Sequence, residues 1–140
     1  MKSYVIDASV VAKCFIEEDY SDKAFEIINA HVKGHLSLSA PSLIVYELGN
    51  IFWRHPHITS EKAYEFIEKF IDLQIGLVDV WSDAELIKKA CAISKSRNLT
   101  FYDSSYLAIV EKDGAKLITA DEYLRNKMPN FVALLKDFKG

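Results

Sequence analysis

The sequence predicts an α/β fold, a three-layer α/β/α sandwich around a mostly parallel sheet of about five strands. Short runs of apolar and β-branched residues alternate with longer segments whose apolar residues recur at helical spacing. The segments between successive strands are long enough for helices, and such crossovers join parallel strands and cover both faces of the sheet. The 140 residues fit one compact domain spanning 1–140, and 50% of them are hydrophobic, which is enough for one core.

In the first half of the chain, local signals place the ends of several elements. Gly34 is expected to end a helix, because glycine readily adopts the left-handed conformation that follows a helix. Pro41 suits the first position of the next helix. The expected elements are, in order, a strand at 3–6, helices at 8–16 and 21–32, a strand at 36–40, and helices at 41–54 and 59–73.

The second half repeats the alternation of strands and helices. Leu86, Ile87, Ala90 and Ile93 form one apolar stripe of a helix, and Gly114 lies in a turn before the next strand. The expected elements are a strand at 76–81, helices at 83–97 and 104–112, a strand at 116–119, a short helix from 121 and a weak strand at 131–135.

Charge and cysteine content narrow the class of protein. The net charge is −3 and the isoelectric point is about 5.8, so the basic field typical of nucleic-acid-binding proteins is missing. An RNA partner would have to be held by a local patch or through metal ions. Cys14 and Cys91 lie in apolar stretches and are expected to be buried and reduced. With neither a signal peptide nor a membrane-spanning stretch visible, we expect a cytoplasmic protein.

Four acidic residues occupy positions where a ligand site is expected. In parallel sheets, ligands bind beyond the carboxyl ends of the strands, where the strand order reverses. Asp7 ends the first strand, Asp121 follows the fourth, and Asp103 precedes a helix. Glu47 lies in a helix that is apolar nearly all round and is therefore expected to be buried. A buried carboxylate is costly unless it is paired or binds a metal.

Each of the strand-end and helix-start acids also has a structural explanation. Asp7 and Asp103 could cap the helices that follow them, because aspartate is a favoured N-cap. Thr119 and Glu122 have the spacing of a capping box, which would place Asp121 in the first turn of a helix, where the helix dipole favours it.

Glu47 is the most informative of the four. Asn50 and Arg54 follow it at i+3 and i+7, so the three form one polar line along the helix, and an ion pair between Glu47 and Arg54 is the structural alternative. If the four carboxylates converge, each close like-charged pair costs about 4 kcal/mol at ~4 Å and an effective dielectric constant of about 20. Hard divalent ions such as Mg²⁺ or Mn²⁺ would offset that repulsion.

The chain resembles the PIN-domain family, the nucleases that include the VapC toxins of toxin–antitoxin pairs. The matching segments are VIDASVVAKCF, APSLIVYELGN and FYDSSYLAIVEKDGAKLITADEYL, whose order and spacing cover nearly the whole chain. The resemblance implies a Mg²⁺- or Mn²⁺-dependent endoribonuclease that acts on RNA, has a cognate antitoxin and forms a homodimer. The apolar excess of the helix pair around Phe52-Trp53 and 66–70 could supply the oligomer surface. It implies metal-binding and catalytic roles for Asp7, Glu47, Asp103 and Asp121, and supporting roles for Ser9, Asn50 and Thr119.

Other interpretations remain open or are weaker. The domain could be a non-catalytic module that binds RNA or protein and keeps its acids for metal-stabilised folding. A haloacid-dehalogenase-type phosphatase would need an aspartate where Ser9 stands. His31 and His35 have the i, i+4 spacing of some zinc sites, but no third ligand is near and Gly34 interrupts the helix. Arg125 and Lys127 could contact an RNA backbone or simply face solvent.

Overall fold

A computed structural model describes residues 1–139 and contains one five-stranded, fully parallel sheet in the order β3-β2-β1-β4-β5. β1 lies at the centre and pairs with β2 on one side and with β4 on the other, for example Val5 with Leu117. The predicted α/β class with a parallel sheet of about five strands is confirmed. The strands are β1 (Lys2–Ile6), β2 (Leu36–Pro41), β3 (Gly76–Val78), β4 (Lys116–Thr119) and β5 (Val132–Leu134).

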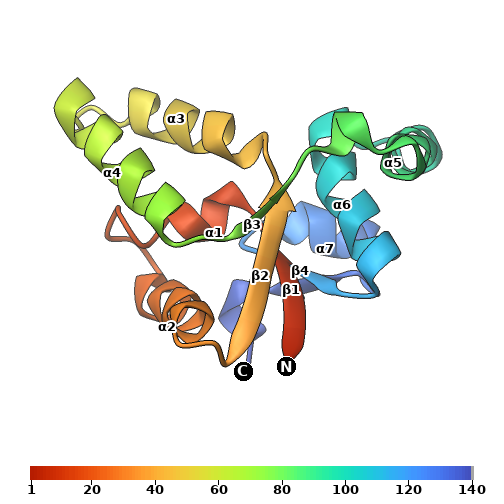
Figure 1. Cartoon of the computed structure of the whole chain (residues 1–140), viewed down its shortest axis with the longest axis horizontal. Helices are drawn as coiled ribbons and strands as arrows, with labels where there is room; N and C mark the ends of the chain where they lie inside the picture. The colour runs from red at the N-terminus through yellow and green to blue at the C-terminus, as the bar shows by residue number, and fades with distance from the viewer. Residues whose placement is uncertain (140) are drawn as a thin grey trace.

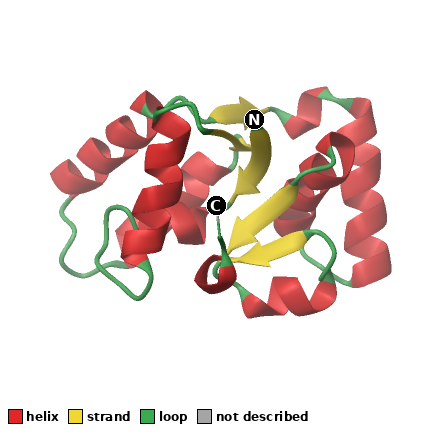
Figure 2. Ribbon diagram, turned by 90° about the horizontal axis from the view of Figure 1, so that it is seen from below, coloured by secondary structure: helices red, strands yellow, loops and turns green. Residues whose placement is uncertain are grey.

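Helices cover both faces of the sheet, as right-handed crossovers require (Figures 1 and 2). The chain runs outward from β1 to β2 and β3 with α1–α4 on one side, then returns across the sheet through α5 and α6 to β4, so the strand order reverses between β1 and β4. The helices are α1 (Ala8–Ala12), α2 (Ser21–Val32), α3 (Ile44–Arg54), α4 (Ser60–Asp72), α5 (Ala84–Arg97), α6 (Phe101–Asp113) and α7 (Glu122–Lys127), with short 3-10 helices η1 (Val80–Ser82) and η2 (Leu135–Asp137).

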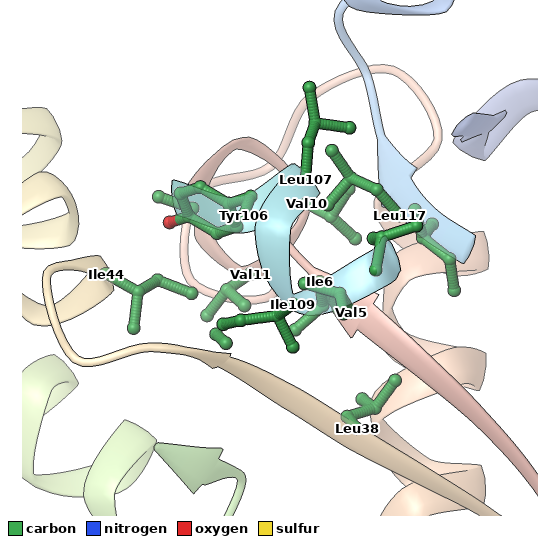
Figure 3. Close-up of a cluster of buried hydrophobic side chains, with 14 of the residues drawn as sticks. Val5, Ile6, Val10, Val11, Leu38, Ile44, Tyr106, Leu107, Ile109 and Leu117 are labelled. Atoms are coloured by element: carbon green, nitrogen blue, oxygen red, sulfur yellow. The ribbon is translucent and has the colours of Figure 1, made fainter. Parts of the chain in front are cut away.

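The core is built between the central strands and the helices on either face (Figure 3). Val5 and Ile6 of β1 and Leu117 of β4 are fully buried, as are Val10 of α1 and Leu107 of α6. Helix α6 is buried continuously from Ser104 to Val110, because it packs on the sheet and is itself covered by α5. α6 therefore has a fixed position above the carboxyl ends of β1 and β4.

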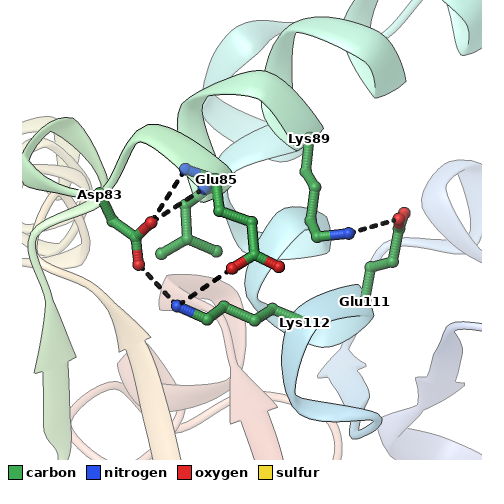
Figure 4. Close-up of polar contacts among 6 residues, drawn as sticks. Asp83, Glu85, Lys89, Glu111 and Lys112 are labelled. Atoms are coloured by element: carbon green, nitrogen blue, oxygen red, sulfur yellow. Dashed lines mark hydrogen bonds and ion pairs between the residues drawn. The ribbon is translucent and has the colours of Figure 1, made fainter.

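Ion pairs tie the outer helix α5 to α6 (Figure 4). The Lys112 ammonium lies 2.6 Å from Asp83, the N-cap of α5, and 3.7 Å from Glu85. Lys89 pairs with Glu111 at 3.0 Å. These contacts lie at the surface and contribute modestly to stability. They nevertheless join α5 to α6, the helix that packs on the sheet.

Several predicted boundaries were wrong, for reasons visible in the structure. Pro41 does not begin a helix: it is the last residue of β2 and lies opposite Val78 of β3, and α3 begins at Ile44. Trp81 is not in a strand but in η1, since β3 ends at Val78. The first helix is also shorter than expected and ends at Ala12.

Helix α3 is buried along one side only. Ile44, Leu48 and Phe52 face the core, whereas Tyr46 and Trp53 are 78% and 76% exposed. The expectation that this helix is buried all round is therefore wrong. Apolar residues also occur on protein surfaces, so an apolar helix is not necessarily a core helix.

The expected oligomer surface around Phe52-Trp53 and 66–70 is also mostly interior. The ring of Phe15 lies 5.9 Å from that of Phe52 and 5.1 Å from that of Phe66, and Phe70 is buried. Of the aromatic residues in that group, Trp53 is the one that faces outward. The aromatic excess in this region mainly fills the gap between α1, α3 and α4.

Cysteine and histidine placement differs in part from expectation. Cys14 is half-buried, and burial raises the pKa of its thiol to about 11, but Cys91 is exposed rather than buried. His31 has a structural position: its Nδ1 accepts a hydrogen bond from the Leu38 N–H at 3.1 Å, and its Nε2 lies 3.1 Å from the Leu73 carbonyl. Within residues 1–139, no helix is long and apolar enough to cross a bilayer.

Candidate active site

The four predicted acids line one cavity at the carboxyl edge of the sheet, next to the point where the strand order reverses. The cavity has a volume of about 350 Å³ and lies between α1, α3, α6 and the start of α7. Its polar lining is Asp7, Ser9, Glu47, Asn50, Arg54, Asp103, Tyr106 and Asp121. The structure thus brings together residues that the sequence places on four separate segments.

Asp7 follows β1 and is held from three directions. Its Oδ1 accepts hydrogen bonds from Ser9 Oγ at 2.6 Å and from the Val10 N–H at 3.3 Å, and its Oδ2 accepts one from Thr119 Oγ1. Asp7 therefore does cap α1, as the structural alternative proposed. Burial nevertheless raises its pKa to about 6, despite these hydrogen bonds, and the charge of Asp103 adds to the increase.

Thr119 joins the two strand-end acids. It is fully buried at the end of β4, donates to Asp7, and accepts a hydrogen bond from the Asp121 N–H at 3.1 Å. The predicted capping box between Thr119 and Glu122 is therefore wrong. Asp121 itself caps α7, because its Oδ1 accepts from the Tyr123 N–H at 2.9 Å. The helix begins too late for Thr119 to cap it, because the N-cap position lies two residues after Thr119.

Glu47 is half-buried on the inward side of α3, and its partner is not Arg54. Glu47 Oε1 accepts a hydrogen bond from Tyr106 Oη at 2.6 Å. Partial burial raises the pKa of Glu47, and the charges of Asp7 and Asp103 raise it further. Within residues 1–139, Glu47 forms no ion pair, so the predicted alternative of a Glu47–Arg54 pair is wrong.

Tyr106 is a site residue that sequence reasoning missed. It is buried on α6, three residues after Asp103, and its hydroxyl faces Glu47 across the cavity. Burial and the neighbouring carboxylates raise its pKa well above the usual range, so the hydroxyl remains a donor. The signal was available: a tyrosine at i+3 from a candidate acid lies on the same helix face.

Asp103 lies within the first turn of α6 and does not cap it. Thr100 is the N-cap and accepts a hydrogen bond from the Asp103 N–H at 3.1 Å. This arrangement leaves the Asp103 carboxylate directed to the cavity rather than to the backbone. Partial burial raises its pKa, and the nearby charge of Asp121 adds to the increase.

Of the other polar and basic residues considered from the sequence, some line this cavity and some do not. Asn50 and Arg54 are both exposed, and Arg54 is the one lysine or arginine among the described residues that line this cavity. Lys127 points elsewhere: its ammonium donates to the Arg97 carbonyl at 3.0 Å and lies 5.6 Å from the Tyr123 ring centroid. Arg125 is exposed on α7.

The donor set fits a hard divalent cation. Asp7, Glu47 and Asp103 all have raised pKa values, partly because each feels another carboxylate, and a bound cation would reverse that effect. Carboxylate oxygens are the ligands that Mg²⁺ and Mn²⁺ prefer. In the described part of the chain, no three Asp, Glu, His or Cys side chains are arranged to hold one ion directly, since Asp7 and Glu47 are turned toward hydroxyl partners. An ion held in this cavity would therefore need ligation through water or rotation of these side chains.

Residues 4–127 match the sequence model of the PIN domain. This chain belongs to the PIN-domain family. The matched region contains all four acids of the cavity. A relative, Ribonuclease VapC3 of Pyrobaculum aerophilum, is 33% identical over 132 residues, which cover 91% of this chain and 96% of the relative. A second relative from the same organism, Exonuclease VapC9, is 27% identical over 96 residues, covering 69% of this chain and 71% of that protein.

Solved structures share the fold of this PIN domain. A chain in the structure of VapBC2 from Rickettsia felis bound to a promoter DNA fragment matches with a TM-score of 0.70. The match covers 94% of this chain and 98% of the other, at 11% sequence identity. At that identity the likeness establishes the arrangement of strands and helices, and it agrees with the sheet order described above.

Proposed function

We propose that this PIN domain is a divalent-metal-dependent endoribonuclease that hydrolyses RNA phosphodiester bonds. The observation that carries the proposal is the convergence of Asp7, Glu47, Asp103 and Asp121 on one cavity, with raised pKa values for the first three. The relative named as a ribonuclease, which is 33% identical over nearly the whole chain, supports the class of reaction.

In the proposed site, Asp7, Glu47 and Asp103 hold a principal Mg²⁺ or Mn²⁺ ion, directly or through water, and Asp121 completes the site or holds a second ion. Such an ion lowers the pKa of a bound water and stabilises charge on the scissile phosphate. Hydroxyl groups fix the ligands in place: Ser9 and Thr119 orient the Asp7 carboxylate.

Two further side chains of the cavity have proposed roles. Tyr106 orients the Glu47 carboxylate through its 2.6 Å hydrogen bond. Asn50 lies one helical turn beyond Glu47 and lines the same cavity, where its amide can bond to a ligand or to water. Both residues act on groups that contact the metal or substrate rather than on the phosphate itself.

We also propose a toxin role with a cognate antitoxin, and a homodimer. Support for the antitoxin comes from a fold match to a chain of a toxin–antitoxin complex from Klebsiella pneumoniae, with a TM-score of 0.67 at 11% sequence identity. Support for the homodimer is the outward face of α3, where Tyr46 and Trp53 are more than three-quarters exposed. A monomer by light scattering at micromolar concentration would exclude the homodimer.

The decisive experiment is cleavage of a circular single-stranded RNA, which has no ends for an exonuclease. Wild type should linearise it with Mg²⁺ or Mn²⁺, and EDTA should stop the reaction. Asp7→Asn and Glu47→Gln should abolish cleavage, whereas Glu26→Gln, at an exposed position of α2, should cleave like wild type. Equal cleavage by all four proteins would refute the site. Metal-dependent stability without cleavage of a broad RNA panel would instead favour a non-catalytic binding module.

A further inference from the structure

A second cavity adjoins the acidic one and shares Asp121 with it. Its volume is about 590 Å³, within the range of small-ligand sites. Three segments form its walls: the connection between α1 and α2, the turn from β4 into α7, and the end of β5. The two cavities therefore meet at Asp121.

Two tyrosines line the second cavity from opposite parts of the sequence. Tyr20, before α2, is 48% exposed, and Tyr123, on α7, is 54% exposed. Unpaired bases stack on exposed aromatic rings, and this stacking is largely independent of sequence. The two rings thus offer stacking surfaces within one nucleotide-sized space.

The backbone at Tyr20 supports a role for this side chain outside folding. Tyr20 has φ +68 and ψ 16, a left-handed conformation that bulky residues rarely adopt. Its side chain makes no capping hydrogen bond to α2. Glycine would adopt this conformation more easily, so local folding does not explain the tyrosine.

The charged groups of the cavity suit a base better than a bare phosphate. Asp19, Asp121 and Glu122 line it together with Lys13 and Lys136. The Lys136 ammonium pairs with Glu122 at 2.7 Å, so part of the positive charge is already balanced. Carboxylates accept hydrogen bonds from the amino and imino groups of bases, while the ammonium groups can meet flanking phosphates.

We propose that this second cavity binds the unpaired RNA nucleotide adjacent to the scissile phosphate, with its base stacked on Tyr20 and Tyr123. The proposal rests on the ribonuclease function proposed above, and it adds a substrate subsite to it. It also explains how an acidic protein can hold RNA, because stacking requires no basic field.

The test is RNA binding measured by fluorescence anisotropy, with 5′-fluorescein octaribonucleotides of A, C, G or U, in an Asp7→Asn background that prevents cleavage. Tyr20→Gly and Tyr123→Ala should each weaken binding by about fivefold to 150-fold, the usual worth of one stacked base. Tyr20→Phe should bind like the parent. Tyr64→Ala, at an exposed position of α4, is the matched control and should also bind like the parent.

The melting temperatures of the variants distinguish loss of the contact with RNA from loss of folding. Tyr20→Gly should melt no lower than the parent, because glycine suits the positive φ at this position. Unchanged RNA affinity in Tyr20→Gly and Tyr123→Ala would overturn the subsite while leaving the ribonuclease proposal intact. Absence of RNA binding by every protein, together with absence of cleavage by wild type, would overturn both.

Discussion

Replacing Asp7 by asparagine tests how much the buried negative charge of Asp7 lowers the free energy of unfolding. Asp7 is held by Ser9, Thr119 and the Val10 N–H, yet its pKa rises from 3.8 to about 6 because burial outweighs these hydrogen bonds. Asparagine has nearly the same shape, and its oxygen can still accept from Ser9 and the Val10 N–H. Its NH2 group then faces Thr119, whose hydroxyl must accept a hydrogen bond instead of donating one. The substitution therefore removes the charge and leaves most contacts in place.

The raised pKa predicts a pH window and a magnitude. A carboxyl group whose pKa is higher in the folded protein binds its proton more tightly there, so protonation favours folding. Stability is therefore lost as the pH rises from 3.8 through about 6. A difference of about two pH units corresponds to ~3 kcal/mol at about 1.4 kcal/mol per unit. The charge of Asp7 also repels that of Glu47 and raises the pKa of Glu47. Removing the Asp7 charge therefore removes this repulsion as well, which further stabilises the variant relative to wild type.

The assay is urea unfolding of wild type and Asp7→Asn between pH 4 and 8 in EDTA. As the pH rises across that range, wild type should lose about 3 kcal/mol of unfolding free energy relative to the variant, and this difference should level off above pH 7. Mg²⁺ or Mn²⁺ should raise wild-type stability at pH 7 and have less effect on the variant. Parallel pH profiles of the two proteins would refute the claim that burial raises the pKa of Asp7.

Two further substitutions test contacts at and away from the cavity. Tyr106→Phe keeps the buried ring but removes the hydroxyl that donates to Glu47. It should lower the free energy of unfolding in urea by about 1–2 kcal/mol and weaken Mn²⁺ binding measured by calorimetry. Unchanged Mn²⁺ affinity would contradict the orienting role of Tyr106. Lys112→Met breaks the contacts with Asp83 and Glu85 between α5 and α6. It should lower the melting temperature slightly at low salt and less at high salt. A decrease in melting temperature that does not depend on salt would point to packing rather than charge.

The alternation of strands and helices could be predicted because its cause is local. The helix at 21–32 and the strand at 116–119 were predicted with the observed bounds. In α2 the apolar spacing matches the buried residues Ala24, Ile27 and Ile28, whereas Phe25 and Val32, which have the same spacing, are exposed. The strand β4 is buried throughout from Leu117 to Thr119. The strand-end positions of Asp7 and Asp121 followed from the same pattern, because all parallel strands present their carboxyl ends at one edge.

The errors arose where a contact distant in sequence decides the outcome. Pro41 was read as a helix start, but pairing with β3 extends β2 through it, and Gly76–Val78 lies far along the chain. Thr119 was assigned to a local cap, but its hydroxyl bonds to Asp7 from the neighbouring strand. The burial of α3 was overestimated because the sequence does not show which side of a helix lacks a covering element.

Tyr106 shows the same limit within the candidate site. Its i+3 spacing from Asp103 placed it on the same helix face, but aromatic residues on helices are more often core residues, so the sequence did not single it out. Its hydroxyl partner, Glu47, is 59 residues away and on the opposite side of the cavity. Only the placement of α3 against α6 around the central strand reveals the contact.

The bond between Thr119 and Asp7 also determines when the site can form. The two residues are 112 positions apart, and β4 must lie beside β1 before they meet. During synthesis, a nascent chain that contains β1 to β3 has neither Thr119 nor Asp121, so its cavity is incomplete. The cavity is therefore completed only after β4 has been synthesised and has paired with β1.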